Sequence, residues 1–458
     1  MNSAHSDSQF LNMTTKPVSH LIPSLAIPTV ISMLVSAIYN MADTFFVSRL
    51  GKSASAAVGI VFSLMAIIQA VGFTLGMGAG SLISRKLGEK DKNAADKYAS
   101  SAFFAALAFG LCLTIFGLRF LDQLVKALGS TQTILPYSKA YARWILLGAP
   151  FMCACFVMNN TLRSEGHAAF SMVALTSGGL LNLALDPLFI FTFHMGTAGA
   201  AIATVISQLV SFVIFLQFFL RKRGTVQIKI SCVSRSLRDY YSIITNGFPS
   251  LCRQGLASVA TILLNNGASL YGDAAIAAMS ITTRIIMFVA SIMIGIGQGY
   301  TPVSGYNYGA KKFSRVREAY WFTVKLGFIV LVICSAVLFI FAPQIISFFL
   351  DDKEVIQIGS IALRCQSCTL PLHSFIISTN MLMQSTGKRV QATFLSCNRQ
   401  GVYFIPLIVI LPLFYKLTGV EISQAIADAL SAVTAVPYII WFLKKLKEQE
   451  SMQAVSDN

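Results

Sequence analysis

Three acidic residues lie inside long apolar stretches of this 458-residue chain: Asp43, Asp186 and Asp428. The other acids fall in polar connections, in the tails or at the ends of apolar stretches. A charged side chain at the centre of a membrane costs about 2.5–3.5 kcal/mol even on the mildest scales, and it usually marks an ion or proton pathway. These residues are therefore the first candidates for chemistry, and binding of a proton or a small cation is the chemistry they suggest.

Two neutral residues extend the acid pair Asp43 and Asp186. Asn182 precedes Asp186 by four residues, so both share one helix face, and Thr204 lies a few residues into the next apolar stretch. Counting about 1.5 Å per residue places Asp186 about 10 Å from the outer membrane boundary. Asp43 and Thr204 lie a few residues from the same boundary. The four side chains are thus predicted to converge into an oxygen-rich set that suits Na⁺ or, through its paired carboxyls, a proton. The plainer alternatives are that Asp186 caps backbone groups freed by Pro187 and that Thr204 bonds its own helix.

The remaining buried charges favour a different role. Asp428 reaches about the same depth as Arg284, so we expect a structural ion pair between them. Arg253 and Arg399 lie deeper than the ends of their stretches. They are expected either to line a cavity or to donate to helix carbonyls.

A cavity for a cargo molecule has four candidate lining residues: Tyr39, Tyr141, Asn159 and Arg284. Tyrosine faces attract organic cations, and Tyr39 lies one helical turn before Asp43. Most of the 34 Phe, 14 Tyr and 16 Met residues must nevertheless face lipid or the protein core. The nine cysteines are scattered without a second pair or a His cluster, so no Cys or His metal site is expected. No cofactor is expected beyond the proton or cation that the acids would bind.

The elements that must position these residues are membrane-spanning helices. The chain is 55% hydrophobic and 12% charged, and its apolar runs have the length of about 20 residues that a transmembrane helix needs. The short alternating strands of a β-barrel are absent from the sequence. Twelve spans are predicted, at 21–46, 55–80, 98–120, 137–160, 168–192, 199–220, 243–268, 276–304, 320–342, 358–384, 391–415 and 420–443.

The basic residues orient these spans. With the N-terminus cytoplasmic, 22 of the 35 lysines and arginines fall in cytoplasmic connections and 7 in external ones, which is a strong positive-inside bias. Both termini are therefore expected in the cytoplasm, and no cleaved signal peptide is expected. The formal charge of +16 is explained by topology, so a nucleic-acid partner is not expected.

The chain also contains an internal repeat. A shift of 221 positions pairs Pro28 with Pro249 and Gly51 with Gly272, whereas Asp43 meets Leu264. We predict an all-α membrane protein with two six-helix lobes related by a pseudo-two-fold axis along the membrane normal. Two such lobes can rock around a central cavity, which favours transport. The predicted parts are a tail (1–20), an N-lobe (21–221), a connection (222–242), a C-lobe (243–444) and a second tail (445–458).

Several segments together resemble one transporter family. These are ADTFFVSRLG after the first span, GMGAGSLISRKLGEKD, LRSEGHA, NLALDPLFIF and, in the second half, GIGQGYTPVSGYNYGAKK. They resemble the multidrug and toxic compound extrusion (MATE) family, over roughly residues 20–444, and look closest to its bacterial MepA-like and DinF-like branch.

The resemblance implies cation-coupled export of organic, often cationic, compounds from a cell by a monomer in the cytoplasmic membrane. It implies that Asp43, Asn182 and Asp186, joined by Thr204, bind the coupling H⁺ or Na⁺, and that the first span bends as occupancy changes. Some members also carry C-lobe acids on spans 7 and 10. This sequence has none there, so coupling is expected to rest on the N-lobe.

Two other functions make different demands on the sequence. A lipid-linked oligosaccharide flippase of a related fold would need a cationic cavity for pyrophosphate, and Arg253, Arg284 and Arg399 keep that alternative open. A membrane enzyme would need a catalytic motif, and the sequence contains neither HExxH nor GxSxG.

Overall fold

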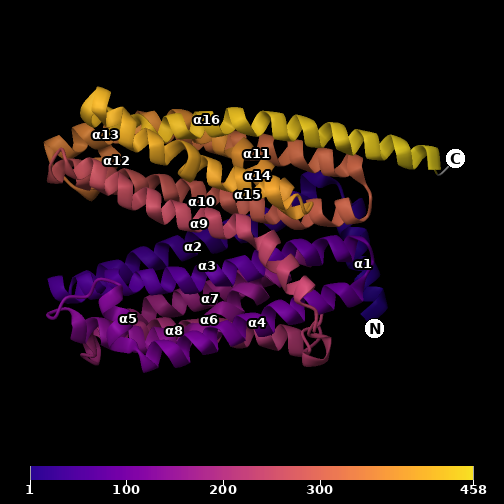
Figure 1. Cartoon of the computed structure of the whole chain (residues 1–458), viewed down its shortest axis with the longest axis horizontal. Coiled ribbons are helices and arrows are strands. Elements are labelled where there is room, and N and C mark those ends of the chain that lie inside the picture. The colour runs from indigo at the N-terminus through magenta and orange to yellow at the C-terminus, as the bar shows by residue number, and fades with distance from the viewer. Residues whose placement is uncertain (1, 457–458) are drawn as a thin grey trace. The chain divides into compact units, whose positions relative to one another are not determined.

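The described chain consists mostly of helices joined by short connections (Figure 1). The structure is a computed structural model that describes residues 2–456; residue 1 and residues 457–458, which end the two predicted tails, lie outside the described residues. No strand occurs in this described part, and nine of its helical segments are long and apolar enough to cross a bilayer. The all-α membrane class predicted from the apolar runs is confirmed.

The first half of the chain forms nine elements, including one π-helix. They are α1 (Asn2–Thr15), α2 (Val18–Ser48), α3 (Lys52–Gly88), α4 (Lys92–Arg119), α5 (Leu121–Ala127), α6 (Leu135–Ser164), α7 (Ala168–Pro187), the π-helix η1 (Leu188–Thr192) and α8 (Gly196–Leu220). The short helix α1 lies within the predicted polar tail.

The second half repeats this order with more interruptions. It forms the 3-10 turn η2 (Ile230–Cys232), α9 (Leu237–Ser269), α10 (Asp273–Gly309), α11 (Phe313–Ile340), α12 (Ala342–Phe349), α13 (Lys353–Thr369), the 3-10 turn η3 (Leu370–Leu372), α14 (His373–Ser385), α15 (Arg389–Cys397), the π-helix η4 (Asn398–Phe404) and α16 (Ile405–Ser456).

These elements account for the twelve predicted spans. The last apolar segment, 389–453, holds two of them, because the backbone of Lys416 leaves the helical region at φ 50° and folds the chain back within α16. The other two spans are α9 and the pair α13–α14. The span formed by α13 and α14 is broken at η3, where Pro371 cannot donate a backbone hydrogen bond.

The repeat is visible in the helix boundaries themselves. α3 and α10 each have 37 residues and begin 221 positions apart. Each follows a glycine with positive φ, 108° at Gly51 and 97° at Gly272, and each precedes a lysine with positive φ, 60° at Lys90 and 57° at Lys311. Glycine suits the first position because it has no Cβ to clash there. The two halves therefore share their turns as well as their helices.

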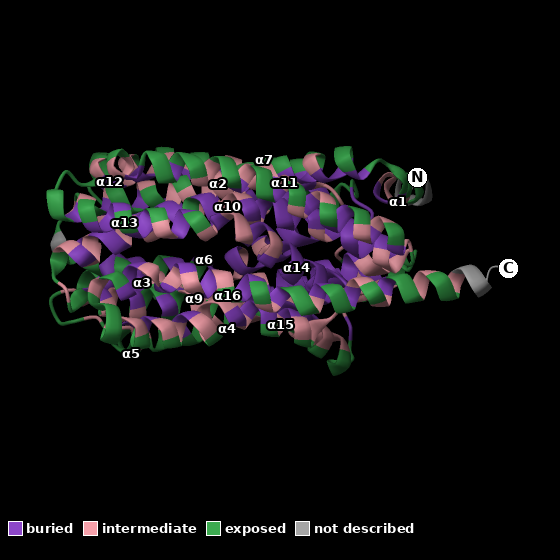
Figure 2. Ribbon diagram, turned by 90° about the horizontal axis from the view of Figure 1, so that it is seen from above, coloured by how far each residue is buried: buried purple, intermediate pink, exposed green. Residues whose placement is uncertain are grey.

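Contacts divide the chain into two compact units. Unit 1 comprises the residues up to Asn12 and Ile31–Gly247, and unit 2 comprises Met13–Val30 and the residues from Phe248 onward. Along their helices, buried and exposed residues alternate, as expected for helices with lipid-facing and packed sides (Figure 2). The first part of α2 thus belongs to unit 2, whereas the sequence had grouped the whole span with the N-lobe.

The first part of α2 is packed closely within unit 2. Thr29 Oγ1 donates to the carbonyl of Gly295 at 2.6 Å. A Cβ on Gly295 would lie 2.7 Å from the Cα of Val30, and a Cβ on Gly299 would lie 2.6 Å from the Cα of Ala26. The two α10 glycines therefore let the α2 backbone come close, while the part of α2 that carries Asp43 belongs to unit 1.

A close contact between α3 and the start of α9 leads to a stability prediction. A Cβ on Gly78 would lie 2.0 Å from the backbone oxygen of Ile243, whereas a Cβ on Gly59 of the same helix would meet no atom within 4 Å. Gly78→Ala is expected to lower stability by about 1–3 kcal/mol through overpacking. Gly59→Ala should raise it by up to about 1 kcal/mol through helix propensity. Thermal unfolding in detergent measures both, and shifts of the same sign would contradict this packing.

The connection that follows α8 is held by polar side chains of unit 1. Glu165 Oε2 accepts hydrogen bonds from the backbone amides of Thr225 and Val226 at 2.7 and 3.2 Å. Asp96 Oδ1 accepts from the amide of Gln227 at 2.8 Å. The predicted connection (222–242) is therefore anchored along its first part.

Glu165 gives a pH prediction. It is fully buried, and burial raises the pKa of its carboxyl from 4.5 to about 8, although two backbone amides donate to it. Between these values the folded protein keeps a proton that the unfolded chain loses, so stability should fall as pH rises from about 4.5 to about 8. Glu165→Gln cannot ionise and should remove that fall. Thermal scans at pH 5 and pH 8 test this, with the exposed Glu89→Gln as control; an unchanged pH slope in Glu165→Gln would contradict it.

Candidate functional site

Unit 1 brings the predicted ion-binding residues together from three helices. Asp43 comes from α2, Asn182 and Asp186 from α7, and Thr204 from α8. All four are buried, with 0–6% of each residue exposed. The α7 residues share a face because they are four apart, and α7 ends immediately after Asp186, at Pro187, where the chain passes into η1.

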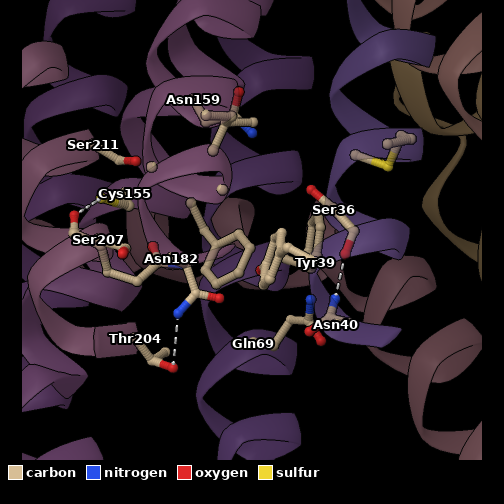
Figure 3. A pocket seen from close by; sticks show the side chains of 17 residues that line it. Ser36, Tyr39, Asn40, Gln69, Cys155, Asn159, Asn182, Thr204, Ser207 and Ser211 are labelled. Atoms are coloured by element: carbon tan, nitrogen blue, oxygen red, sulfur yellow. Dashed lines mark hydrogen bonds between the residues drawn. The ribbon is translucent and has the colours of Figure 1, made fainter. Parts of the chain in front are cut away.

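Hydrogen bonds link three of these four residues directly. Asn182 Nδ2 donates to Asp186 Oδ1 at 3.1 Å and to Thr204 Oγ1 at 3.5 Å (Figure 3 shows the second bond). The Thr204 hydroxyl itself donates to the carbonyl of Ala200 at 3.0 Å, so it bonds its own helix and the site. Asp186 accepts from the Asn182 side chain rather than capping the backbone near Pro187.

The two carboxyl groups are not neutralised by a basic residue. In the described part of the chain, no lysine, arginine or histidine forms an ion pair with Asp43 or Asp186. Asp43 Oδ1 and Asp186 Oδ2 are buried and have no hydrogen-bond partner there. The two carboxyls act on each other electrostatically. Each therefore presents a buried oxygen that a cation or a proton would satisfy.

Tyr141 belongs to the same cluster. It is fully buried on α6, and both Asp43 and Asp186 act electrostatically on its hydroxyl. The hydroxyl donates to the sulfur of Met65 at 3.7 Å. Tyr141 does not line the described cavity next to this cluster, and its role in lining a cargo cavity stays a prediction.

A cavity of about 110 Å³ adjoins this cluster within unit 1. Tyr39, Asn159, Asn182 and Thr204 line it (Figure 3). Asn159 is held in place by the hydroxyl of Ser171, which donates to its Oδ1. Asn182 and Thr204 thus belong to both the carboxyl cluster and the cavity wall.

The sequence reasoning missed most of the neutral polar wall. The further polar lining residues are Ser36, Asn40, Gln69, Ser207, Gln208 and Ser211. A signal was available, because Ser36 and Asn40, and likewise Ser207 and Ser211, are four residues apart and share a helix face. Neutral polar side chains are common in membrane spans, so they do not stand out in a sequence as charged residues do.

Unit 2 has no carboxyl pair at the equivalent place. Leu264, the counterpart of Asp43, is 6% exposed and packs in a hydrophobic cluster. Its presence there indicates that the fold does not need an acid at this position. The asymmetry between the halves favours a functional role for Asp43.

The predicted ion pair between Asp428 and Arg284 is wrong. Asp428 Oδ1 instead accepts from Arg399 Nε at 2.6 Å, and its Oδ2 lies 2.9 Å from His373 Nε2. Arg284 is exposed on α10. Equal depth in the membrane does not make two residues neighbours, because each helix also has a rotation about its own axis. A lining role for Arg284 stays a prediction.

Comparison with known proteins relates the chain to one family. The sequence model of the MatE family matches residues 28–188 and 249–410. The multidrug export protein MepA of Staphylococcus aureus (strain MSSA476) is 27% identical over 439 residues, which is 96% of this chain and 97% of that protein.

Solved structures are similar as well. A crystal structure of MATE in complex with MaL6 has a TM-score of 0.91 at 30% identity and covers 96% of this chain and 99% of that one. An outward-facing MATE family multidrug resistance transporter has a TM-score of 0.90 at 30% identity, covering 95% and 99%. Together with the matched repeats, these likenesses establish that the chain belongs to the MatE family and is a membrane transporter rather than an enzyme.

Proposed function

We propose that this protein is an antiporter that exports drug-like organic cations in exchange for H⁺ or Na⁺. The observation that supports this most is the carboxyl pair Asp43 and Asp186, buried without a basic partner and with one unpaired oxygen on each residue. A buried, uncompensated carboxylate is costly. Binding a cation or a proton removes that cost, so occupancy of this site is linked to the conformation of its helices.

The oxygens available suit either coupling ion. Na⁺ is a hard cation that prefers carboxylate, amide and hydroxyl oxygens, which Asp43, Asp186, Asn182 and Thr204 supply. Two carboxyls that act on each other favour holding one proton. The coupling ion is the one cofactor-like component that we propose.

The cargo enters as a competitor or as a trigger for rearrangement. The cavity of about 110 Å³ is smaller than the roughly 300–1,000 Å³ of pockets that hold drug-sized ligands. Movement of the α2 segment that carries Tyr39 and Asp43 would enlarge it, as the expected bend of this helix implies. The negative charges of Asp43 and Asp186 favour cationic cargo, since Coulomb attraction is strong in a low-dielectric interior.

The MepA relatives are multidrug export proteins, and we extend this activity to the present chain as part of the proposal. We place the protein in the cytoplasmic membrane of a bacterial cell as a functional monomer with both termini in the cytoplasm. The charge bias of the connections supports that orientation.

The flippase alternative has little support. It needs a cationic cavity, and the cavity of unit 1 is lined by neutral side chains. Of the arginines that kept this alternative open, Arg399 is paired with Asp428 and Arg284 is exposed.

Efflux from proteoliposomes tests the proposal. Vesicles loaded with a fluorescent organic cation are given an inward-directed proton gradient, a Na⁺ gradient, both or neither, with the electrical potential clamped. We expect one gradient to drive efflux well above the rate without a gradient. Equal rates in all four conditions would overturn antiport, and the gradient that drives efflux identifies the coupling ion.

A further inference from the structure

Unit 2 contains a second buried ionisable cluster, around Asp428 on α16. Asp428 is 2% exposed and takes part in three hydrogen bonds. Arg399 Nε and Gln424 Nε2 donate to its Oδ1 at 2.6 and 2.9 Å, and its Oδ2 lies 2.9 Å from His373 Nε2. The three partners come from η4, from α16 itself and from the first residue of α14. The cluster thus ties together the two places where the helices of unit 2 change their winding.

His373 is the unusual member of the cluster. It is 1% exposed, and its Nε2 faces Asp428. Its Nδ1 is buried without a hydrogen-bond partner among the described residues. When Nε2 donates to a carboxylate, the neutral ring keeps a bare lone pair on Nδ1. A buried acceptor with no partner is costly, and a proton bound there would turn the ring into an imidazolium beside Asp428.

The cluster occupies positions that do something else in unit 1. The repeat pairs Arg399 with Gly178 and Asp428 with Ser207. Gly178 and Ser207 both line the cavity of unit 1. A Cβ on Gly178 would lie 2.8 Å from the backbone oxygen of Ser207, so the paired positions are close neighbours in each unit. One unit therefore has a cavity where the other has an ion pair. The proposed function uses the cavity and the carboxyl pair of unit 1, and it gives no role to the ion pair between Asp428 and Arg399.

We propose that His373, Asp428 and Arg399 form a second proton-binding site, in which a proton on His373 displaces Arg399 from Asp428. With His373 neutral, Arg399 compensates the Asp428 carboxylate. With His373 protonated, the imidazolium compensates it, and the guanidinium is released.

Charge and exposure explain why Arg399 is the group that leaves. Two cations beside one buried carboxylate would leave a net buried charge, which is costly. His373 and Asp428 are 1% and 2% exposed, but the Arg399 side chain is 25% exposed. Arg399 also lies in a π-helix, a form of helix that is rare overall but is often found at functional sites. It can therefore move its charge toward water while the other two stay in place.

The other charged and titratable groups nearby do not replace this exchange. In the described chain, the charges that act on His373 are those of Arg399 on η4 and Asp428 on α16. Glu421, buried on α16 two turns before Asp428, acts on Cys365 of α13. Tyr320 of α11 pairs its hydroxyl with Thr379 of α14 at 2.9 Å. Protonation of His373 is thus the event that changes the balance at Asp428.

Nuclear magnetic resonance on the purified full-length protein tests this directly. The protein is labelled with ¹⁵N at its histidine rings and arginine side chains, and the His373 and Arg399 signals are assigned with His373→Gln and Arg399→Lys. We expect His373 to gain a proton as the pH falls, and the Arg399 Nε signal to change with the same midpoint. An Arg399 signal that stays constant through the His373 titration would overturn the exchange.

Matched variants test the partner charges. Arg399→Gln should raise the proton affinity of His373 at least about tenfold and Asp428→Asn should lower it by a similar factor, because charges within reach shift proton affinity about 10- to 1,000-fold. Arg399→Lys keeps the charge, so the proton affinity of His373 should stay near that of wild type. This variant therefore supplies a comparison if Arg399→Gln or Asp428→Asn folds poorly. His20→Gln, an exposed site, is the control. A His373 that stays neutral to pH 5 in both wild type and Arg399→Gln would overturn the site.

These measurements do not depend on transport. They can therefore refute the proton site at His373 while coupling at Asp43 holds, or support it while coupling at Asp43 is refuted. The site also differs from the C-lobe acids that some family members carry on spans 7 and 10, since its acid lies on the last span.

Discussion

Asp43→Asn is expected to abolish gradient-driven efflux while leaving the protein folded and able to bind cargo. The amide has nearly the same shape as the carboxyl, but it carries no charge and does not take up a proton. Coupling between two sites typically amounts to about 1–3 kcal/mol, or about 5- to 150-fold in affinity. In wild type, the coupling ion should change cargo affinity by a factor in this range. In Asp43→Asn that factor should fall to one.

Two measurements check this result. Fluorescence titration of an organic cation onto the purified protein, with and without Na⁺ and at two pH values, gives the coupling factor. Efflux from proteoliposomes gives transport. Asp122→Asn is the matched control, since Asp122 is an exposed acid that pairs with Lys139 at 2.6 Å on the surface. Retained gradient-driven efflux in Asp43→Asn would refute coupling at this residue.

Arg399→Gln is expected to destabilise the protein at pH 8 by about 3–5 kcal/mol, because removing one partner of a buried pair leaves an uncompensated charge. The charge left behind is Asp428, which is 2% exposed. Arg284→Gln is the control: it removes an exposed arginine, and such surface changes usually stay within about 0.5 kcal/mol. Thermal or denaturant unfolding in detergent measures both. A loss for Arg284→Gln as large as that for Arg399→Gln would contradict the observed pairing.

The loss should shrink as the pH is lowered to about 5.5. In Arg399→Gln, a proton on His373 compensates Asp428 in the folded state, and this contribution is present at low pH and lost as pH rises. The double variant Arg399→Gln with His373→Gln should show no such recovery. If both variants lose the same stability at every pH, His373 does not take over the role of Arg399.

Much of the fold follows from patterns that lie along the chain. Apolar length predicts a transmembrane helix because every backbone group must be bonded inside lipid. The repeat could be read from glycines and prolines, since these residues fix backbone shape, and the same turns recur at Gly51 and Gly272. The π-turn at η4 was not predicted, because it depends on how neighbouring helices pack. The break at η3 was not predicted either, although Pro371 lies in it.

The cluster of Asp43, Asn182, Asp186 and Thr204 was predictable for a related reason. A carboxylate in an apolar stretch stands out in composition, and helix periodicity alone places Asn182 beside Asp186. Depth along the membrane then brings Asp43 and Thr204 to the same level. The neutral cavity wall did not stand out, since Ser36 or Gln69 in a span is ordinary until a cavity is seen next to it.

By itself, then, the sequence determined the helical class, the duplication and the acids that lie inside the membrane spans, because each is a property of residue type, spacing or depth. The tertiary structure alone decided the partners. Depth alone suggested Arg284 as the partner of Asp428, whereas rotation about each helix axis together with the π-turn at η4 brought Arg399 to it. That rotation is set by packing against neighbouring helices, which a linear pattern does not contain.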